Sequence, residues 1–258
     1  MNLRPIVGKF LRRRRRLHYT PPAKDGDKYH IQSSWMYLDD MDSLKLSQYG
    51  IYEPEETIII KKLVKKNYTV LDIGANIGYF TLIMAKQCKQ VYGFEPENRN
   101  FQTLKKNVQL NQLSNVKLYN VAVAETTGKA TLHLCEGNRG MHRIYPSRWC
   151  NEGMMEIETV RISDIIHHAD FIKLDVEGAE LGALKGMKDL LNNNDITLLM
   201  EFHPPSIEEY GSQPIAIYDL LKSLGYNIKV PSRGPVSFAE LEKIAIEKVG
   251  TNIICTRQ

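Results

Sequence analysis

The chain has 258 residues, enough for one large α/β domain, and its 43% hydrophobic and 25% charged residues are ordinary for a soluble globular protein. Its net charge of +4 owes much to the arginine run Arg12–Arg16, so the remainder is near neutral and a broadly basic surface is excluded. No apolar run reaches the ~20 residues that a membrane span needs, and no secretory or twin-arginine signal is visible.

Residues 1–27 are expected to form a basic, flexible tail in front of a single domain, residues 28–258. Two prolines and a glycine follow the arginine run. The tail is either a solvated chain end or a segment attracted to RNA or to anionic lipid. It lacks the interleaved aromatic residues that are typical of single-stranded nucleic-acid binding.

Short strands are expected within Tyr29–Leu38, and a helix from Glu53 to about Lys65. Pro54 suits the first helical position, and acidic residues in the first turn suit the helix dipole. This helix is expected to cover one edge of a ligand cleft formed by the residues that follow it.

The stretch Thr69–Tyr79, TVLDIGANIGY, combines a buried strand, a glycine turn and the start of a helix, as nucleotide-binding α/β folds do. Gly74 permits the tight turn and Gly78 allows close packing of the helix. A dinucleotide site favours glycine where this chain has Asn76, so a ligand without phosphates fits better. S-adenosyl-L-methionine (SAM) is such a ligand, and Asp72 can accept a hydrogen bond from its ammonium group.

Glu95 follows a second strand, Gln90–Phe94, about twenty residues beyond the turn. An acid at this distance hydrogen-bonds both ribose hydroxyls of an adenosine cofactor, a feature that SAM sites share with NAD sites. A helix is expected from Glu97 to about Leu110, and a third strand over Val116–Val123 should end beside the adenine.

A strand over Lys129–Leu134 precedes a long segment without periodicity, residues 136–153. Such a segment is either a substrate lid or a plain surface loop. Its arginines would suit an anionic or sugar-bearing substrate, and they are Arg139, Arg143 and Arg148.

The four cysteines are scattered and show no C-x-x-C spacing; they are Cys88, Cys135, Cys150 and Cys255. We therefore expect free thiols, a reducing and hence cytoplasmic location, and no zinc site.

Strands and helices alternate through the rest of the chain, which predicts a Rossmann-like, mostly parallel sheet with helices on both faces. The expected strands are Ile157–Ile162, Phe171–Leu174, Ile196–Met200, Tyr226–Val230 and Asn252–Thr256. Ligands bind such sheets at the carboxyl ends of the strands. Asp72, Asp175 with Glu177, and Glu201 with His203 all follow strands and should converge there. Buried acids without partners are costly, so strand-end acids usually have a function.

Five blocks in this order and spacing resemble the FkbM-type family of class I SAM-dependent methyltransferases: TVLDIGANIGYFTL, VYGFEPE, NVAVAE, FIKLDVEGAE and LLMEFHP. The resemblance covers roughly Glu53 to Pro204, the SAM-binding core. It implies a seven-stranded sheet with an antiparallel last strand, SAM as methyl donor, and often O-methylation of a hydroxyl. Macrolides, sugars and glycolipids are among the family's substrates.

The resemblance also implies roles for individual residues. It assigns Asp72, Gly74, Asn76 and Gly78 to the methionine end of SAM, Glu95 to the ribose, Ala122 to the adenine and Asp175 to the strand end nearest the reacting methyl. The arginine-rich tail and residues 136–153 fall outside the family's pattern.

A base near the methyl would help an acceptor hydroxyl by ~10²–10⁴-fold, and His203 has the best intrinsic pKa for this task. Asp175 and Glu177 are the alternatives. Each also has a structural interpretation: His203 as a hydrogen-bonded strand end, and the acids as caps or first-turn residues of the next helix. The same residues with Glu201 could hold Mg²⁺, although we expect no metal.

The sequence thus predicts a SAM-dependent methyltransferase that acts on a hydroxyl of a small molecule, glycan or lipid-linked acceptor. An RNA methyltransferase that uses the arginine-rich tail is the first alternative. A non-catalytic binding module with a SAM-type fold is the second, and an NAD dehydrogenase fits least well because of Asn76.

Overall fold

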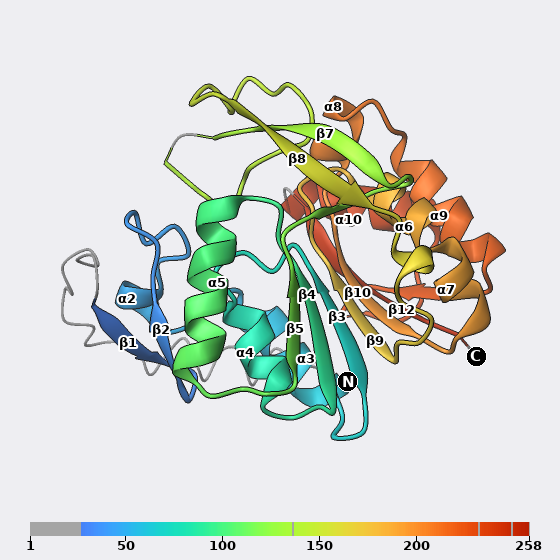
Figure 1. The fold of residues 1–258 in the computed structure, drawn as a ribbon. Helices are drawn as coiled ribbons and strands as arrows, with labels where there is room; N and C mark the ends of the chain where they lie inside the picture. The colour runs from blue at the N-terminus through green and yellow to red at the C-terminus, as the bar shows by residue number, and fades with distance from the viewer. Residues whose placement is uncertain (1–26, 136, 232, 249, 258) are drawn as a thin grey trace.

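The computed structural model describes residues 27–135, 137–231, 233–248 and 250–257 (Figure 1). The predicted basic tail therefore lies outside the described residues, apart from Asp27. Within the described part of the chain, seven strands form a main sheet in the spatial order β11-β12-β10-β9-β3-β4-β5. They are β3 (Thr69–Ile73), β4 (Gln90–Phe94), β5 (Val116–Tyr119), β9 (Phe171–Leu174), β10 (Thr197–Phe202), β11 (Asn227–Lys229) and β12 (Thr251–Thr256).

The direction of the strands confirms the predicted α/β fold. β12 pairs antiparallel with both of its neighbours, and the other pairs in the main sheet are parallel. β3 leads outward to β4 and β5 on one side, whereas β9 and β10 lie on its other side. The order of connection reverses between β3 and β9, and open α/β sheets bind ligands at such a switch point.

Helices cover both faces of the main sheet (Figure 1). One face carries α3 (Pro54–Leu63), α4 (Tyr79–Ala85) and α5 (Asn98–Leu110); the other carries α6 (Glu180–Gly186), α7 (Lys188–Asn193), α8 (Pro204–Glu209), α9 (Pro214–Ser223) and α10 (Phe238–Lys248). Successive strand residues point to opposite faces, so Val70 packs with α4 while Leu71 packs in the core on the other side. The buried, continuously apolar strands are typical of a parallel sheet that is covered on both faces.

A smaller sheet lies over the carboxyl ends of the strands of the main sheet (Figure 1). It consists of β6 (Ala122–Val123), β8 (Met154–Val160) and β7 (Gly128–His133), and the short 3₁₀ helix η1 (Ile162–Asp164) follows it. The prediction of one strand over Val116–Val123 was wrong, because the chain leaves the main sheet at Asn120. The amide of Asn120 donates to the carbonyl oxygens of Glu95 (2.8 Å) and Pro96 (3.0 Å), which fixes the break and brings Ala122 over the end of β4.

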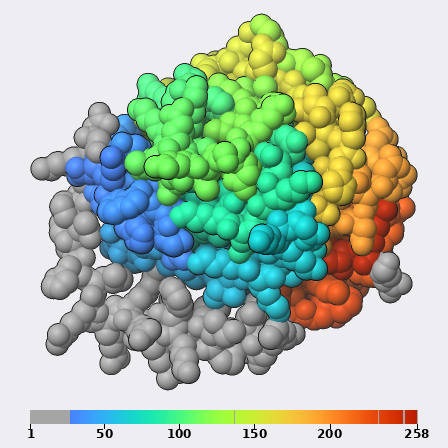
Figure 2. Space-filling model, turned by 60° about the horizontal axis from the view of Figure 1, so that its bottom comes forward, coloured from blue at the N-terminus to red at the C-terminus, as the bar shows by residue number. Residues whose placement is uncertain are grey.

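The N-terminal hairpin packs against α5 through two asparagines. The hairpin strands are β1 (Lys28–Ile31) and β2 (Ser34–Tyr37), and α2 (Leu46–Tyr49) follows them. Asn107 pairs with both backbone groups of Tyr37, and Asn111 pairs in the same way with Trp35. Their amide groups therefore replace a neighbouring strand at this edge, and Figure 2 shows the blue N-terminal residues lying directly against the green part of the chain.

Among the described residues, none of the helices combines the length and the apolar character that crossing a bilayer requires.

Two glycines of α6 offer a matched test of the contact between α6 and the small sheet. A Cβ at Gly186 would lie 1.9 Å from the carbonyl oxygen of Ala124, whereas a Cβ at Gly182 would meet only the hydroxyl of Tyr210 at 3.7 Å. We expect Gly186→Ala to lower the free energy of unfolding by about 1–3 kcal/mol or more, since backbone must move. Gly182→Ala should leave it unchanged or raise it by up to ~1 kcal/mol, because alanine favours a helix. Urea unfolding followed by circular dichroism measures both, and equal effects would contradict the close approach.

Candidate functional site

A pocket lies at the carboxyl ends of β3, β4 and β9, beneath the small sheet. Six of the residues predicted to form a site line it: Gly74, Asn76, Glu95, Ala122, Asp175 and Glu177. Its apolar lining includes Tyr52, Phe80, Phe94, Val121 and Leu132. The pocket therefore combines a polar floor, formed by strand ends, with apolar walls.

The glycine turn after β3 forms one edge of the pocket. Gly74 has a φ of +82°, and a Cβ there would lie 1.8 Å from the carbonyl oxygen of Asp175, so the turns after β3 and β9 are in direct contact. The backbone N–H groups of Gly74 and Ala75 both donate to the carbonyl of Phe94 at 3.0 Å. The glycine therefore allows three strand ends to meet at the pocket.

Glu95 faces the pocket from the end of β4 and is 6% exposed. Its Oε2 accepts the N–H of Asn76 and its Oε1 accepts the N–H of Glu97, both at 2.9 Å. Burial raises the pKa of Glu95 to about 7, although these two hydrogen bonds favour its charged form. The carboxylate is thus held rigidly, and its predicted contact with a ribose stays a prediction.

Asp72 occupies a different position from the predicted one. Its side chain is fully buried and is not part of the pocket lining, and its Oδ2 accepts a 2.5 Å hydrogen bond from the hydroxyl of Thr81. Burial raises its pKa, and Lys173, its register partner on β9, opposes that rise. Side chains alternate along a strand, so the residue before Ile73 points into the layer of α4. Gly78, also outside the lining, contacts Leu104 of α5.

Lys173 is a site residue that the sequence reasoning missed. It is 5% exposed, lines the pocket, and places its Nζ 3.0 Å from Oδ2 of Asp175 and 5.0 Å from the ring centre of Phe80. Burial alone would lower the pKa of this lysine, but the charges of Asp175, Asp72 and Glu53 outweigh it and the pKa is raised. A lysine inside a short apolar strand, FIKL, was the available signal, because such a position buries its charge.

Asp175 and Glu177 are brought together at the pocket, as predicted for adjacent residues of one strand-end turn. Burial, followed by the charge of Asp175, raises the pKa of Glu177 to about 8, while Arg143 opposes the rise. Asp175 instead forms an ion pair with Lys173, 3.0 Å away. The two carboxyls are therefore chemically distinct: one is paired with a cation, and the other holds a proton close to neutral pH.

His203 does not line the pocket with these carboxyls, although it lies beside Arg143 and shares the hydroxyl of Ser206 with it. Its Nδ1 accepts the N–H of Ser206 and so caps α8, and its ring also contacts the hydroxyl of Ser206 at 2.7 Å. It is not part of the pocket lining. A histidine between a strand and a helix can serve the backbone rather than the cleft, and here Pro204, which supplies no N–H, begins the helix that His203 caps.

The alternative of a metal site has no support in the geometry. Across the described ranges, no group of three or more His, Cys, Asp or Glu side chains is arranged to hold a metal ion. Glu201 lines a separate hollow with Glu55, Glu56 and Asn252. It still lies within reach of the pocket acids, because burial and then the charges of Asp175 and Glu177 raise its pKa.

The segment predicted as either a lid or a surface loop contributes to the pocket. Arg139, Gly140, His142 and Ile144 are part of the lining. The backbone N–H of Arg139 donates to the hydroxyl of Ser43, and its guanidinium is paired with Asp40 at 2.8 Å. The loop therefore closes one side of the pocket and is tied to the N-terminal segment.

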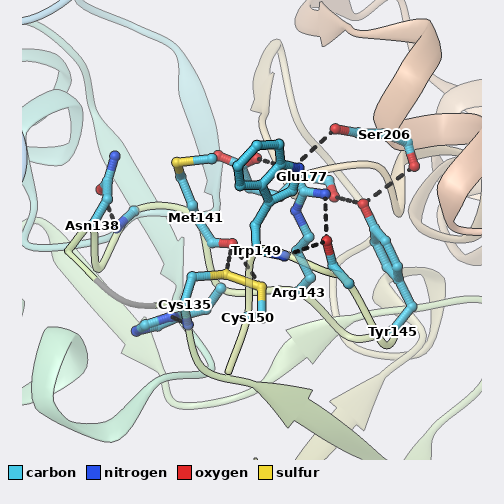
Figure 3. Close-up of a disulfide and its surroundings, with 12 residues drawn as sticks. Cys135, Asn138, Met141, Arg143, Tyr145, Trp149, Cys150, Glu177 and Ser206 are labelled. Atoms are coloured by element: carbon cyan, nitrogen blue, oxygen red, sulfur yellow. Dashed lines mark hydrogen bonds and ion pairs between the residues drawn. A yellow bond between two sulfur atoms is a disulfide. The ribbon is translucent and has the colours of Figure 1, made fainter. Parts of the chain in front are cut away.

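A disulfide joins the two ends of this loop, which corrects the expectation of four free thiols. Cys135 is bonded to Cys150 (Figure 3), whereas Cys88 and Cys255 are free and buried. The two cysteines are fifteen residues apart, a spacing that matches no metal or redox motif. Their pairing follows from the way in which the loop returns to the end of β7, which no sequence pattern indicated. With two of its four cysteines in a disulfide, the chain does not have the set of free thiols that would indicate a reducing, cytoplasmic location.

Comparisons with known proteins identify the family of this chain. The family described as "Methyltransferase FkbM domain" matches residues 72–228, more than half of the chain. "Methyltransferase sdnD" of Sordaria araneosa is 26% identical over 71% of this chain and 87% of its own length. "Methyltransferase 1" of Beauveria bassiana is 26% identical over 46% of this chain, which spans 58% of that relative's length.

Among solved structures, the methyltransferase FkbM of Methylobacillus flagellatus aligns with 74% of this chain and 43% of its own, with 20% identity and a TM-score of 0.48. On the family match, the chain belongs to the FkbM methyltransferase family, which confirms the resemblance inferred from its motifs.

The disulfide predicts a thiol count. In denaturant without a reductant, a thiol reagent should titrate two cysteines, Cys88 and Cys255, and after reduction it should titrate four. Cys150→Ser should lower the free energy of unfolding by up to about 3 kcal/mol, the cost expected for opening a loop of about fifteen residues. Cys88→Ser serves as the control. Four reactive thiols before reduction would contradict the pairing.

Lys173 can be compared with Lys185, an exposed lysine that is paired with one acid. Lys173→Met should lower the free energy of unfolding by ~3–5 kcal/mol, because it leaves Asp72 and Asp175 without their cation. Lys185→Met removes a solvent-exposed pair with Glu125 and should cost no more than ~1 kcal/mol. Urea unfolding at neutral pH measures both, and similar losses would show that Lys173 does not hold the site together.

Proposed function

We propose that this member of the FkbM methyltransferase family binds SAM in the pocket described above and transfers its methyl group to a hydroxyl of a small-molecule, glycan or lipid-linked acceptor. What supports this is one arrangement: Glu95 and the backbone of the glycine turn face the same pocket as Asp175 and Glu177. Cofactor-binding groups and proton-accepting groups thus border a common space.

The residues present fit SAM. In the proposed mode the methionine end lies by Gly74 and Asn76, Glu95 accepts hydrogen bonds from the ribose hydroxyls, and the adenine lies against the apolar side that includes Ala122. Asp72 does not touch the ammonium group in this mode. It lies under the pocket and interacts with the charge of Lys173. A pocket bordered by several carboxyls favours a cofactor that carries positive charge.

When bound, SAM supplies a methyl group on a positively charged sulfur, which is a good leaving group. The protein then has to orient the acceptor hydroxyl and accept its proton. Glu177 is better suited to this than Asp175, because its pKa of about 8 makes it a stronger base than an ordinary carboxylate. Asp175 is tied to Lys173, and we assign it to fixing the shape of the turn.

The RNA alternative rests on the arginine-rich tail, which lies outside the described residues. Deleting residues 1–16 separates the two functions: methylation of small acceptors should persist, whereas methylation of RNA that disappears with the deletion would favour the alternative. A lack of any SAM affinity would exclude both and revive the binding-module alternative.

Cofactor binding should depend on pH through Glu95. Hydroxyl groups donate to an ionised carboxylate, and the ionised fraction of a group with a pKa of about 7 falls about tenfold from pH 8 to pH 6. We expect the affinity for SAM, measured by calorimetry, to fall by a similar factor. Glu95→Gln should weaken binding at pH 8 by ~1–3 kcal/mol and remove most of the pH dependence.

Glu97→Gln is a matched control, because Glu97 is buried next to Glu95 but caps α5 through the N–H of Asn100 and does not line the pocket. It should retain a pH dependence of similar size, displaced to lower pH because the charge of Glu97 raises the pKa of Glu95. Transfer of labelled methyl groups from SAM into fractions of host extract then tests the reaction itself. Wild-type affinity in Glu95→Gln would remove the ribose assignment.

A further inference from the structure

The turn after β9 has a backbone that requires support from its surroundings. Glu177 has a φ of +55° and Gly178 a φ of +104°, so a non-glycine residue that lines the pocket lies in the left-handed region. Such a conformation is sparsely populated and persists where neighbouring groups determine it. The groups that hold Glu177 are therefore candidates for a role in the chemistry.

Contacts from two sides hold this turn. From within, Oε1 of Glu180 accepts the N–H groups of Val176 (3.3 Å) and Gly178 (3.1 Å). From the loop, the hydroxyl of Tyr145 donates to the carbonyl oxygen of Glu177 at 2.9 Å. It also lies 3.2 Å from the carbonyl oxygen of Ser206 on α8 (Figure 3). The backbone of Glu177 is thus fixed by the same loop that closes the pocket.

Arg143 of this loop is built into the protein rather than free at its surface. It is 4% exposed, and its backbone pairs in both directions with His133 at the end of β7. Its guanidinium lies 2.6 Å from Oε2 of Glu209 and within hydrogen-bond distance of the hydroxyls of Ser147 (3.2 Å) and Ser206 (3.3 Å). These contacts hold its charge 3.9 Å from Oε2 of Glu177 (Figure 3).

The electrostatic surroundings of Glu177 make this arginine important. Most of the other titratable groups that face it or its immediate partners are acidic or phenolic: Tyr52, Glu53, Tyr145, Asp175, Glu180, Glu201 and Glu209. The exception is His203, which shares the hydroxyl of Ser206 with Arg143 and whose pKa is lowered by burial and by the charge of Arg143. Of the groups that act on the carboxyl of Glu177, Arg143 is the one within the described residues that favours its ionised form. Lys173 is engaged by Asp175.

We propose that Arg143 is a positioning residue: it favours the ionised form of the Glu177 carboxyl and directs this group at the pocket, where Glu177 accepts the proton of the acceptor hydroxyl. This rests on the proposed function and deepens it, because the loop that closes the pocket also completes the base. In the transfer, the hydroxyl oxygen forms a bond to the methyl carbon, the carbon–sulfur bond breaks with its electron pair remaining on sulfur, and the proton goes to Glu177.

The test follows the titration of Glu177 directly by carbon-13 NMR on protein labelled at the glutamate carboxyl carbon, with Glu177→Gln used to assign the signal. In Arg143→Met we expect the titration of Glu177 to move to higher pH by one unit or more, because its favourable cation is lost. Arg148→Met is the matched control: Arg148 belongs to the same loop but lies exposed over Trp149, and the titration should not move.

Glu209→Gln should shift the titration of Glu177 in the opposite direction. It also keeps the proposal testable if Arg143→Met fails to fold. Removing the carboxylate that shares Arg143 should move the titration of Glu177 to lower pH. A purely structural role for Arg143 would not produce opposite shifts in the two variants. An unmoved titration in Arg143→Met that still binds S-adenosylhomocysteine, or in Glu209→Gln, overturns the proposal.

Calorimetry with S-adenosylhomocysteine separates this proposal from the proposed function. Wild type and Arg143→Met should bind it with affinities within about twofold, because Arg143 does not line the cofactor side of the pocket. Lack of binding by the wild type would refute the proposed function, while the NMR titration would still report on Arg143. In host extract, the rising limb of the pH–rate profile for labelled methyl transfer should shift upward in Arg143→Met by the same amount as the titration.

Discussion

The crowding of carboxyl groups at the carboxyl ends of β3, β9 and β10 is the constraint on which the site depends. Ionised carboxylates cannot share a space that excludes water unless cations or protons compensate them. Lys173 compensates Asp175 and Asp72 from inside the sheet, and Arg143 acts on Glu177 from the loop. The remaining acids respond by holding protons more tightly, so the pKa values of Glu95 and Glu180 rise to about 7. Burial thus has the largest effect on the protonation of the pocket acids, and the cations Lys173 and Arg143 counteract it.

The main sheet alone leaves the pocket open on one side, and the small sheet with its loop closes it. Asn120 ends β5 and sends the chain across the pocket, where β7 and β8 carry the loop between Cys135 and Cys150. Residues far apart in the sequence therefore meet: Arg139 reaches back to the N-terminal segment, and Arg143 reaches forward to α8.

Much of the fold was predictable because it is recorded in local patterns. The glycine turn after Thr69–Ile73, the alternation of strands and helices, and the acid after β4 all follow from short-range rules, and the structure has each of them. The rest depended on contacts that a pattern does not contain. Whether Asp72 faces the pocket or the layer beneath it is decided by a single step of strand register, and His203 serves α8 because of the helix that happens to follow. The disulfide and the break at Asn120 result from long-range packing.

Asp175 is paired with Lys173, whereas Glu177 holds a proton near neutral pH, so the binding of a charged cofactor should affect the protonation of Glu177. A cation that enters the pocket favours the ionised form of every carboxyl nearby, so a positively charged cofactor would lower the pKa of Glu177 from about 8 toward neutrality. The proton would then leave Glu177 when the cofactor binds, before an acceptor arrives. After transfer the sulfur is neutral, and the pocket loses the charge that kept its acids ionised. The buried acids are unfavourable in the empty protein. Because of them, Glu177 would be ionised mainly while a methyl-bearing, positively charged cofactor is bound.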